Sequence, residues 1–213
     1  MIDRSDCRFI IFAKAPVPGE VKTRLIPVLG EGDTTLLYER MVLHTLTTAV
    51  NAALGPVDLW CTPSMEHPFF RRCNEEYKVK LMNQTDGDIG RRMAYALCET
   101  LKRASRALLL GTDCPSLTAD DLREAAALLK EETDAVIIPS EDGGYVLIGL
   151  RRNADDLFRG ISWGTERVME ETRLRLRNLG WQWHELPERW DVDRSEDVER
   201  LKVEGYLSLV STL

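Results

Sequence analysis

The sequence predicts an α/β fold in which helices cover both faces of a mostly parallel sheet, giving three layers. Short apolar runs with the length and composition of buried strands recur along the chain, and amphipathic helical patterns lie between most of them. Strands that alternate with helices pair in parallel through right-handed crossovers, so both faces of the sheet become covered. We therefore expect a doubly wound, Rossmann-like arrangement.

Six apolar runs are the expected strands of this sheet. The first, Phe9-Ile10-Ile11-Phe12, consists of aromatic and β-branched residues, which are typical of buried strands. A half-exposed strand is also expected over residues 181–186, where apolar and polar side chains alternate. The six expected buried strands cover residues 9–13, 57–62, 79–82, 107–111, 135–139 and 146–150.

Two helices are expected between these strands. Residues 34–52 place their apolar side chains largely on one stripe, as in a helix that packs against a sheet. Residues 118–131 begin with Thr118 three positions before Asp121, which is the pattern of a capping box. The spacing of strands and helices is that of successive βαβ units.

The last third of the chain alternates less regularly, so we expect a mixed arrangement there. A helix is predicted over residues 165–179. A final helix is predicted over residues 197–206, with Ser195 as its N-cap and with Glu196 and Asp197 near the positive end of the helix dipole.

Length and composition favour one soluble domain over residues 1–213. The chain is 44% hydrophobic and 30% charged, and no change of composition divides it. Its net charge of −7 argues against a nucleic-acid surface, which depends on clustered Lys and Arg.

Five cysteines, odd in number and never spaced as C-x-x-C, predict reduced thiols rather than disulfides or a zinc site. No run approaches the ~20 apolar residues of a membrane helix, so we expect a cytoplasmic protein that does not bind membranes.

The most informative motif is the loop after the first expected strand, Ala13-Lys14-Ala15-Pro16-Val17-Pro18-Gly19-Glu20-Val21-Lys22-Thr23-Arg24-Leu25. Open α/β sheets bind ligands at the carboxyl ends of their strands, so Lys14, Lys22 and Arg24 are predicted to hold phosphates. The loop is not a Walker A motif, because Val21 stands where a glycine must precede the lysine, and it lacks the dinucleotide fingerprint G-x-G-x-x-G. The alternative is a solvated basic connection, which two prolines and a glycine make less favourable.

A second motif, Gly111-Thr112-Asp113-Cys114-Pro115-Ser116-Leu117, follows another expected strand. An acid at this position stands where a divalent cation would meet a nucleotide, so Asp113 is the predicted first metal ligand. The alternative is that Asp113 only shapes the turn before the next helix. Cys114 is expected to be a small buried residue, since no histidine partner can be assigned to it.

Two further carboxylates occur in the segment Trp190-Asp191-Val192-Asp193-Arg194-Ser195. If the segment is extended, Asp191 and Asp193 lie on the same side of the chain, and either would suit a second metal ligand. The alternative is a charged turn ahead of a capped helix. The sequence does not separate the two acids.

Asp142, Gly143 and Gly144 precede an expected strand, and the paired glycines would let the backbone approach an acceptor substrate closely. An ordinary tight turn explains the same residues equally well. Trp163 would face a sugar or a base, although most tryptophans lie in the core.

The segment from Gln84 to Met93 forms a turn that leads into a helix and contains Gly87. Amides at the N-terminus of such a helix would contact an anion or the edge of a base. A helix start without a ligand explains the segment about as well.

These motifs and their order resemble GT-A-type transferases of the nucleotide-diphospho-sugar transferase superfamily. The chain is similar to the 2-phospho-lactate guanylyltransferases and, more distantly, to the molybdenum-cofactor guanylyltransferases. The resemblance covers nearly the whole chain, and it is specific for the fold rather than for the reaction. It rests on A-K-x-P-x-P-G-x-x-K-T-R-L over residues 13–25, the segment 84–93, G-T-D-C-P-S-L over 111–117, D-G-G-Y over 142–145 and D-V-D over 191–193.

The resemblance implies a role for each motif. Asp113 would bind Mg²⁺ or Mn²⁺, and Asp191 or Asp193 would complete the shell of the ion. The catalytic residues would be Lys22, Arg24 and Asp113, and the residues that bind the acceptor would be Asp142, Gly143, Gly144 and Trp163. The nucleotide would be bound by Ala13, Lys14, Gly19, Lys22, Thr23, Arg24, Gln84 and Gly87.

The predicted reaction is nucleotidyl transfer from a nucleoside triphosphate to a small phosphorylated or hydroxylated acceptor. Asp113-Cys114-Pro115 resembles the D-x-P of nucleotidyltransferases, whereas Gly111 stands where the D-x-D of glycosyltransferases has its first acid. The Pro-rich loop differs from the G-x-G-x-R loop of sugar nucleotidyltransferases. Glycosyl transfer from a sugar nucleotide, and nucleotide binding without turnover, are the alternatives.

Overall fold

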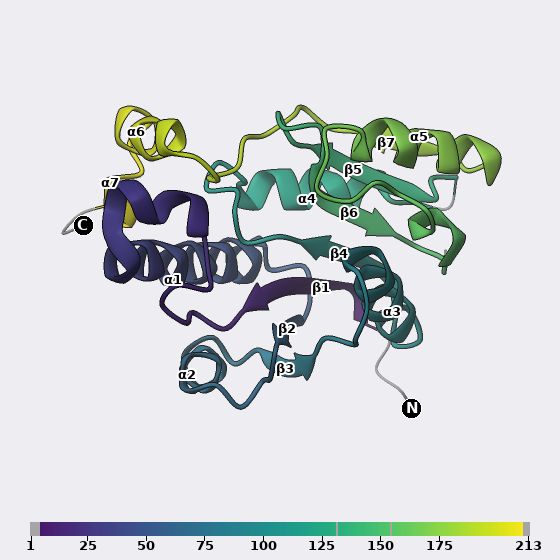
Figure 1. Cartoon of the computed structure of the whole chain (residues 1–213). Helices are drawn as coiled ribbons and strands as arrows, with labels where there is room; N and C mark the ends of the chain where they lie inside the picture. The colour runs from purple at the N-terminus through teal and green to yellow at the C-terminus, as the bar shows by residue number, and fades with distance from the viewer. Residues whose placement is uncertain (1–4, 131, 154, 211–213) are drawn as a thin grey trace.

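A seven-stranded sheet forms the centre of the computed structural model, which describes residues 5–130, 132–153 and 155–210 (Figure 1). The strand order is β3-β2-β1-β4-β6-β5-β7. Only β6 runs antiparallel to its neighbours, so the sheet is mostly parallel, as predicted. The strands are β1 (Ser5–Lys14), β2 (Val57–Thr62), β3 (Lys80–Asn83), β4 (Ala104–Leu110), β5 (Ala135–Pro139), β6 (Tyr145–Leu150) and β7 (Trp183–Glu185).

Helices cover both faces of this sheet. None of the helices in the described part of the chain is long and apolar enough to cross a membrane. Two short 3₁₀ helices, η1 (Thr23–Leu25) and η2 (Asp155–Phe158), occur in loops. The α-helices are α1 (Ile26–Ala52), α2 (Pro68–Tyr77), α3 (Ile89–Leu101), α4 (Ala119–Leu128), α5 (Val168–Asn178), α6 (Ser195–Val203) and α7 (Leu207–Val210).

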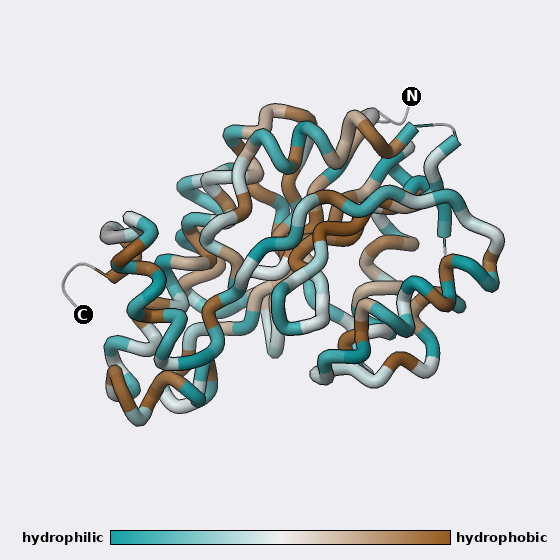
Figure 2. The backbone as a smooth tube through the Cα atoms, turned by 90° about the horizontal axis from the view of Figure 1, so that it is seen from above, coloured by the Kyte–Doolittle hydropathy of each residue, from teal (hydrophilic) through white to brown (hydrophobic). Residues whose placement is uncertain are grey.

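Alternating side chains of the strands build one apolar layer on each face of the sheet. On β1, Phe9 and Ile11 pack with residues of α1, α2, α4, α6 and α7, whereas Ile10 and Phe12 pack with residues of α3, α5 and η2. Figure 2 shows the hydrophobic strand segments in the middle of the molecule. Each fully buried Leu, Ile or Phe stabilises the fold by about 1.5–3 kcal/mol, so these two layers fix the three-layer architecture.

All six expected strands are present. Five of them start and end within three residues of the predicted bounds, and β1 starts four residues earlier than predicted. The strand expected at residues 79–82 is not buried as predicted, because β3 lies at the edge of the sheet and its side chains are partly or fully exposed. The expected strand over residues 181–186 is the short β7. The expected helix over residues 34–52 is the main part of α1, which begins earlier and is interrupted at Gly30, where φ is 78°. The helix α2 was not among the expected elements.

The predicted capping box of α4 is confirmed. Thr118 Oγ1 accepts a hydrogen bond from the backbone N–H of Asp121 (3.1 Å), and the carboxylate of Asp121 accepts one from the N–H of Thr118 (2.9 Å). The expected end of this helix at residue 131 lies outside the described residues, and α4 itself ends at Leu128.

The predicted N-cap of α6 is wrong. Ser195 is the first residue of this helix rather than the residue before it. The carboxylate of Asp197 instead accepts hydrogen bonds from the N–H groups of Asp193 (2.9 Å) and Arg194 (2.7 Å). An acid within the first turn therefore holds the preceding chain, which leaves the serine without a capping role.

An ion cluster lies near the amino end of β2, away from the carboxyl ends of the strands. Asp58 is fully buried, and its two carboxylate oxygens accept hydrogen bonds from Arg8 (2.9 Å) and Arg103 (3.0 Å). Arg8 lies on β1 and Arg103 follows α3, so the cluster connects two strands and a helix. Both oxygens of the buried carboxylate are satisfied.

Replacing Asp58 by Asn should destabilise the protein by about 3 kcal/mol, because two largely buried guanidinium groups lose their counter-ion. Denaturant-induced unfolding measures the free energy of unfolding. The matched control is Asp156→Asn, which removes an exposed ion pair with Arg159 and should cost less than about 1 kcal/mol. Similar losses in the two variants would contradict the structural role of the Asp58 cluster.

Candidate functional site

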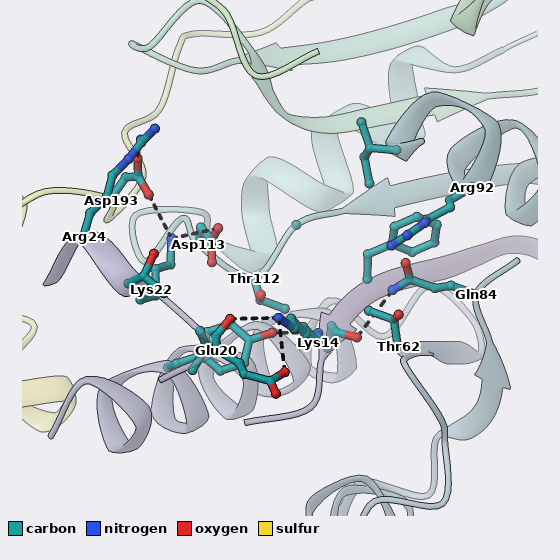
Figure 3. A pocket seen from close by; sticks show the side chains of 17 residues that line it. Lys14, Glu20, Lys22, Arg24, Thr62, Gln84, Arg92, Thr112, Asp113 and Asp193 are labelled. Atoms are coloured by element: carbon teal, nitrogen blue, oxygen red, sulfur yellow. Dashed lines mark hydrogen bonds and ion pairs between the residues drawn. The ribbon is translucent and has the colours of Figure 1, made fainter. Parts of the chain in front are cut away.

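A cavity of about 640 Å³ lies at the carboxyl ends of β1, β2 and β4, and we call it the basic-loop cavity (Figure 3). Strands β1 and β4 pair in parallel, so the loops that follow them open on the same edge of the sheet. Eight of the predicted site residues line this cavity: Ala13, Lys14, Lys22, Thr23, Arg24, Gln84, Asp113 and Asp193.

Lys22 is the anchor of one end of the cavity. Its ammonium group lies 2.8 Å from Asp113 Oδ2, 2.5 Å from the carbonyl oxygen of Val192 and 3.9 Å from Asp193 Oδ1. The side chain is only 7% exposed, and a buried charge is tolerated where it is paired in this way. The residue adopts the left-handed conformation, with φ 46°, which is uncommon for a residue with a side chain.

The segment with Asp191 and Asp193 joins the same end of the site through its backbone. The N–H of Val192 donates a hydrogen bond to the carbonyl oxygen of Asp113 (2.8 Å). Val192 is fully buried, so the two acids flank a core residue. Asp193 forms an ion pair with Arg24, whose side chain is exposed. Two regions about 80 residues apart in the sequence are therefore held together.

The other end of the cavity is formed by the end of β1 and the loop after β3. Lys14 Nζ donates to the carbonyl oxygen of Glu20 (2.8 Å) and lies 3.5 Å from its carboxylate. The backbone N–H of Lys14 donates to the hydroxyl of Tyr38 (2.8 Å). Gln84 Nε2 donates to the carbonyl oxygen of Trp60 (2.8 Å), which fixes the amide beside the cavity.

Asp191 lies in a less exposed environment than Asp193. Its Oδ1 accepts a hydrogen bond from Ser140 Oγ (2.8 Å). Burial raises the pKa of Asp191 above its usual value, and the charges of Asp142 and Asp113 act in the same direction. Asp191 and Asp113 both line a connecting cavity of about 150 Å³ next to the basic-loop cavity.

A third cavity, of about 790 Å³, adjoins the other two, and we call it the acidic cavity. It shares Arg24 and Asp193 with the basic-loop cavity and Asp191 with the connecting cavity. Asp142 and Gly143, which the sequence predicts to bind the acceptor, line this cavity. The three cavities therefore share lining residues and lie next to one another.

These residues do not form a complete metal centre by themselves. Within residues 5–130, 132–153 and 155–210, no three His, Cys, Asp or Glu side chains are grouped closely enough to hold an ion. Asp113, Asp191 and Asp193 nevertheless belong to cavities that adjoin one another. The predicted coordination of one ion by Asp113 and a second acid stays a prediction.

Comparison with known proteins identifies the family. Residues 45–165 match the family DUF2064, which is described as an uncharacterized protein conserved in bacteria. The chain belongs to this family. The match includes Gln84, Asp113 and Asp142, whereas Lys22 and Asp193 lie outside the matched residues. No curated protein sequence matches the chain significantly.

Solved structures share the fold of this DUF2064 protein. A protein of Desulfovibrio desulfuricans G20, described as a "putative nucleotide-diphospho-sugar transferase", has a TM-score of 0.87 at 27% identity, over 97% of this chain and 94% of its own. CMP:2-keto-3-deoxy-manno-octonic acid synthetase in complex with CTP has a TM-score of 0.61 at 14% identity, over 96% of this chain and 100% of its own. A Mycobacterium tuberculosis H37Rv protein in complex with manganese has a TM-score of 0.53 at 19% identity, over 93% and 98%.

These comparisons confirm the predicted fold of nucleotide-diphospho-sugar transferases. The likeness to the 2-phospho-lactate guanylyltransferases is not confirmed and stays a prediction. The comparisons do not test the roles predicted for individual residues, because a shared fold does not by itself determine the reaction.

Three of the predicted residues lie away from the cavities in the described part of the DUF2064 protein. Gly19, with φ 80°, forms the turn of the basic loop. Gly87 accepts a hydrogen bond from Arg92 Nε (2.9 Å) and forms the turn before α3. Trp163 packs edge-on against Tyr145, with 6.4 Å between the ring centroids. Gly144 lines the connecting cavity.

Sequence reasoning missed several polar residues of the site. Arg92 and Thr112 line the basic-loop cavity and lie within the quoted motifs, so their positions already placed them near it. Tyr38 lies in the middle of α1, and only the packing of that helix against β1 brings it to the cavity. Burial raises the pKa of the Tyr38 hydroxyl far above its usual value. Ser140 was not singled out within its segment.

Cys114 is a buried residue, as predicted. It is 5% exposed, and burial raises the pKa of its thiol to about 11. A thiol with such a pKa is a weak nucleophile at neutral pH, because only the thiolate reacts.

Lys22→Met should lower the free energy of unfolding by about 1–3 kcal/mol, because Asp113 and the carbonyl oxygen of Val192 lose their shared donor. Arg24→Met is the control, since it removes a cation that is 68% exposed and should cost less than about 1 kcal/mol. Chemical denaturation of the two variants compares these costs. An equal or larger loss in Arg24→Met would contradict the anchoring role of Lys22.

Asp191→Asn should make the protein more stable at pH 7. The raised pKa means that the folded state favours protonated Asp191, so ionised Asp191 opposes folding at neutral pH. The asparagine keeps an oxygen that accepts from Ser140. The advantage of the variant should shrink as the pH falls, because the wild-type carboxyl then becomes protonated. Unfolding curves between pH 7 and pH 4 test this, and a constant difference across that range would rule out the assigned cause.

Proposed function

We propose that this DUF2064 protein is a metal-dependent nucleotidyltransferase that uses a nucleoside triphosphate and a small hydroxylated acceptor. The observation that carries the proposal is the meeting of the basic loop with Asp113 in one cavity at the carboxyl edge of the sheet. Open α/β sheets bind nucleotides at this edge. Fold neighbours that were crystallised with CTP and with manganese support the same assignment.

Asp113 has the chemistry of a ligand for Mg²⁺ or Mn²⁺. Its Oδ2 is paired with Lys22, whereas its Oδ1 is buried and has no hydrogen-bond partner among the described residues. A buried carboxylate oxygen without a partner is a group that a bound cation would satisfy. Mg²⁺ needs only one or two carboxylates, because phosphate oxygens and water complete its shell. The bound ion would neutralise charge on the phosphates.

Asp191 is the stronger candidate for the second carboxylate ligand. Asp193 already has a cationic partner in Arg24 and lies 3.9 Å from the ammonium of Lys22. The hydrogen-bond donor to Asp191 is the neutral hydroxyl of Ser140. Coordination by Asp191 would therefore break no ion pair, and Asp191 shares the connecting cavity with Asp113.

In the proposed reaction, the hydroxyl oxygen of the acceptor forms a bond to the α-phosphorus and its proton passes to water, while the bond from this phosphorus to the bridging oxygen breaks and pyrophosphate leaves. Catalysis of this kind depends on positioning and on charge neutralisation. Lys22 and Arg24 supply the charge at one end of the basic-loop cavity. Lys14 and Arg92 supply it toward the other end, where Gln84 is held beside the cavity.

The acidic cavity favours a hydroxylated acceptor over a phosphorylated one. Only two guanidinium groups, Arg24 and Arg194, line it among the described residues. A phosphate entering this space would meet like charge at close range, which is unfavourable. The carboxylates that line the cavity are Glu141, Asp142, Glu166, Asp191, Asp193 and Asp197.

The reaction products separate this proposal from the alternatives. Release of pyrophosphate from a nucleoside triphosphate supports nucleotidyl transfer, whereas release of a nucleoside diphosphate from a sugar nucleotide supports glycosyl transfer. A thermal-shift screen with both donor classes, with and without Mg²⁺ or Mn²⁺, selects the donor first. A ligand at a hundred times its Kd stabilises a protein by about 2.7 kcal/mol, which such a screen detects. Tight binding without any product would support a binding protein.

Asp113→Asn should reduce pyrophosphate release at least about 100-fold, because a fixed charge that acts on the reacting phosphates is lost. Turnover with Mg²⁺ and the selected triphosphate measures the effect. The control is Asp120→Asn, which changes an exposed acid on α4 and should leave turnover unchanged. Full metal-dependent turnover by a folded Asp113→Asn variant would disprove the role of this residue.

A further inference from the structure

The side chain of Tyr38 brings a buried hydroxyl group to the basic-loop cavity from the middle of α1. The residue is 5% exposed, and its ring packs in the apolar layer between α1 and the sheet. Its oxygen accepts a hydrogen bond from the backbone N–H of Lys14 (2.8 Å), at the end of β1. Helix packing and a backbone donor therefore hold the hydroxyl in place.

A phenolic hydroxyl donates one hydrogen bond in addition to those it accepts. The N–H of Lys14 is a donor, so this contact leaves the hydrogen of the Tyr38 hydroxyl unused. Among the described residues, Tyr38 donates no hydrogen bond to a carbonyl or carboxylate oxygen. Thr112 is a second side-chain hydrogen-bond partner of Tyr38, and this bond acts to lower the pKa of the phenol, as a donor to the phenolic oxygen does. A hydrogen-bond donor is thus available at a cavity wall that is otherwise tightly packed.

Asp113 presents the opposite case at the same cavity. Its Oδ1 is a buried acceptor without a partner, and Lys22 holds its Oδ2. Tyr38 and Asp113 both line this cavity, and among the described residues no hydrogen bond joins the two side chains. The cavity therefore contains an unused donor and an unused anionic acceptor that do not satisfy each other.

The two unused groups together define the ligand that fits them. A free anion would bind the Tyr38 donor but would be repelled by Asp113, and a free cation would bind Asp113 but offer no acceptor to Tyr38. A phosphate oxygen that carries a divalent cation satisfies both groups, and the cations of the basic loop lie in the same cavity.

We infer that Tyr38 is a phosphate-binding residue, whose hydroxyl donates a hydrogen bond to an oxygen of a phosphate group bound together with a divalent cation at Asp113. This inference rests on the proposed function for the identity of the cavity, but it concerns binding and not turnover. It adds a neutral donor from α1 to the cationic residues of the loop.

The test uses Tyr38→Phe, which keeps the packed ring and removes the hydroxyl. Isothermal titration calorimetry with inorganic triphosphate in excess Mg²⁺ should show binding weakened about 10- to 100-fold, the effect of losing one hydrogen bond to a charged group. Titration with Mg²⁺ alone should show no change. The control is Tyr95→Phe, which removes an exposed hydroxyl outside the cavity and should bind triphosphate as the wild type does.

Equal affinity of the wild type and Tyr38→Phe for magnesium triphosphate would overturn the inference, as would the lack of any triphosphate binding by the wild type. If the wild type binds triphosphate through Tyr38 but releases no pyrophosphate from any nucleoside triphosphate, the proposed function fails and the inference stands.

A measurement on the wild type covers the case in which Tyr38→Phe folds poorly through loss of the acceptor for the Lys14 N–H. The ring carbon that bears the hydroxyl is labelled with ¹³C in all five tyrosines, and the other four signals are assigned by Tyr→Phe substitution. Magnesium triphosphate should shift the signal of Tyr38 but not that of Tyr95. An unmoved Tyr38 signal at saturating triphosphate would overturn the inference.

Discussion

The buried ammonium group of Lys22 is the contact on which the arrangement of the site depends. It binds Asp113 after β4 and the carbonyl oxygen of Val192 near the C-terminal end of the chain, while its own residue lies in the loop after β1. A charge that is 7% exposed is stable only if it is paired, so folding must bring these three segments together. The ammonium also orients Asp113, because it occupies one carboxylate oxygen and leaves the other open.

The backbone at Lys22 shows what this contact costs. Its left-handed conformation is one that glycine adopts easily and that costs a residue with a side chain about 1–3 kcal/mol. A glycine at this position would remove the strain but also the ammonium. The hydrogen bond to Val192 and the ion pair to Asp113 offset the strain, and both contacts belong to the cavity edge. The strained backbone conformation of Lys22 therefore lies among the charged residues of the basic-loop cavity.

The sequence predicts the sheet and the edge that carries the site, because strand composition and helix spacing are local patterns. It also singles out Lys22 and Asp113, since Lys22 lies in the loop after the first expected strand and Asp113 lies close after another. The different surroundings of Asp191 and Asp193 are not predictable in the same way. They depend on Arg24 and Ser140, which lie about 170 and 50 residues away in the chain. The sequence does not predict Tyr38 as a site residue for a similar reason. Its position in a helix does not indicate which strand end its hydroxyl contacts.

The carboxylates of Asp58, on β2, and Asp113, in the loop after β4, differ in how completely their oxygens are paired. Asp58 is fully buried, and each of its oxygens accepts a hydrogen bond from an arginine, so the cluster holds strands and a helix together and needs nothing more. Asp113 has one oxygen paired with Lys22 and one buried oxygen without a partner. An unsatisfied buried acceptor lowers stability, and folded proteins retain few of them. This unpaired oxygen lies at the edge where open α/β sheets bind ligands, and the cation that we propose at Asp113 would satisfy it there.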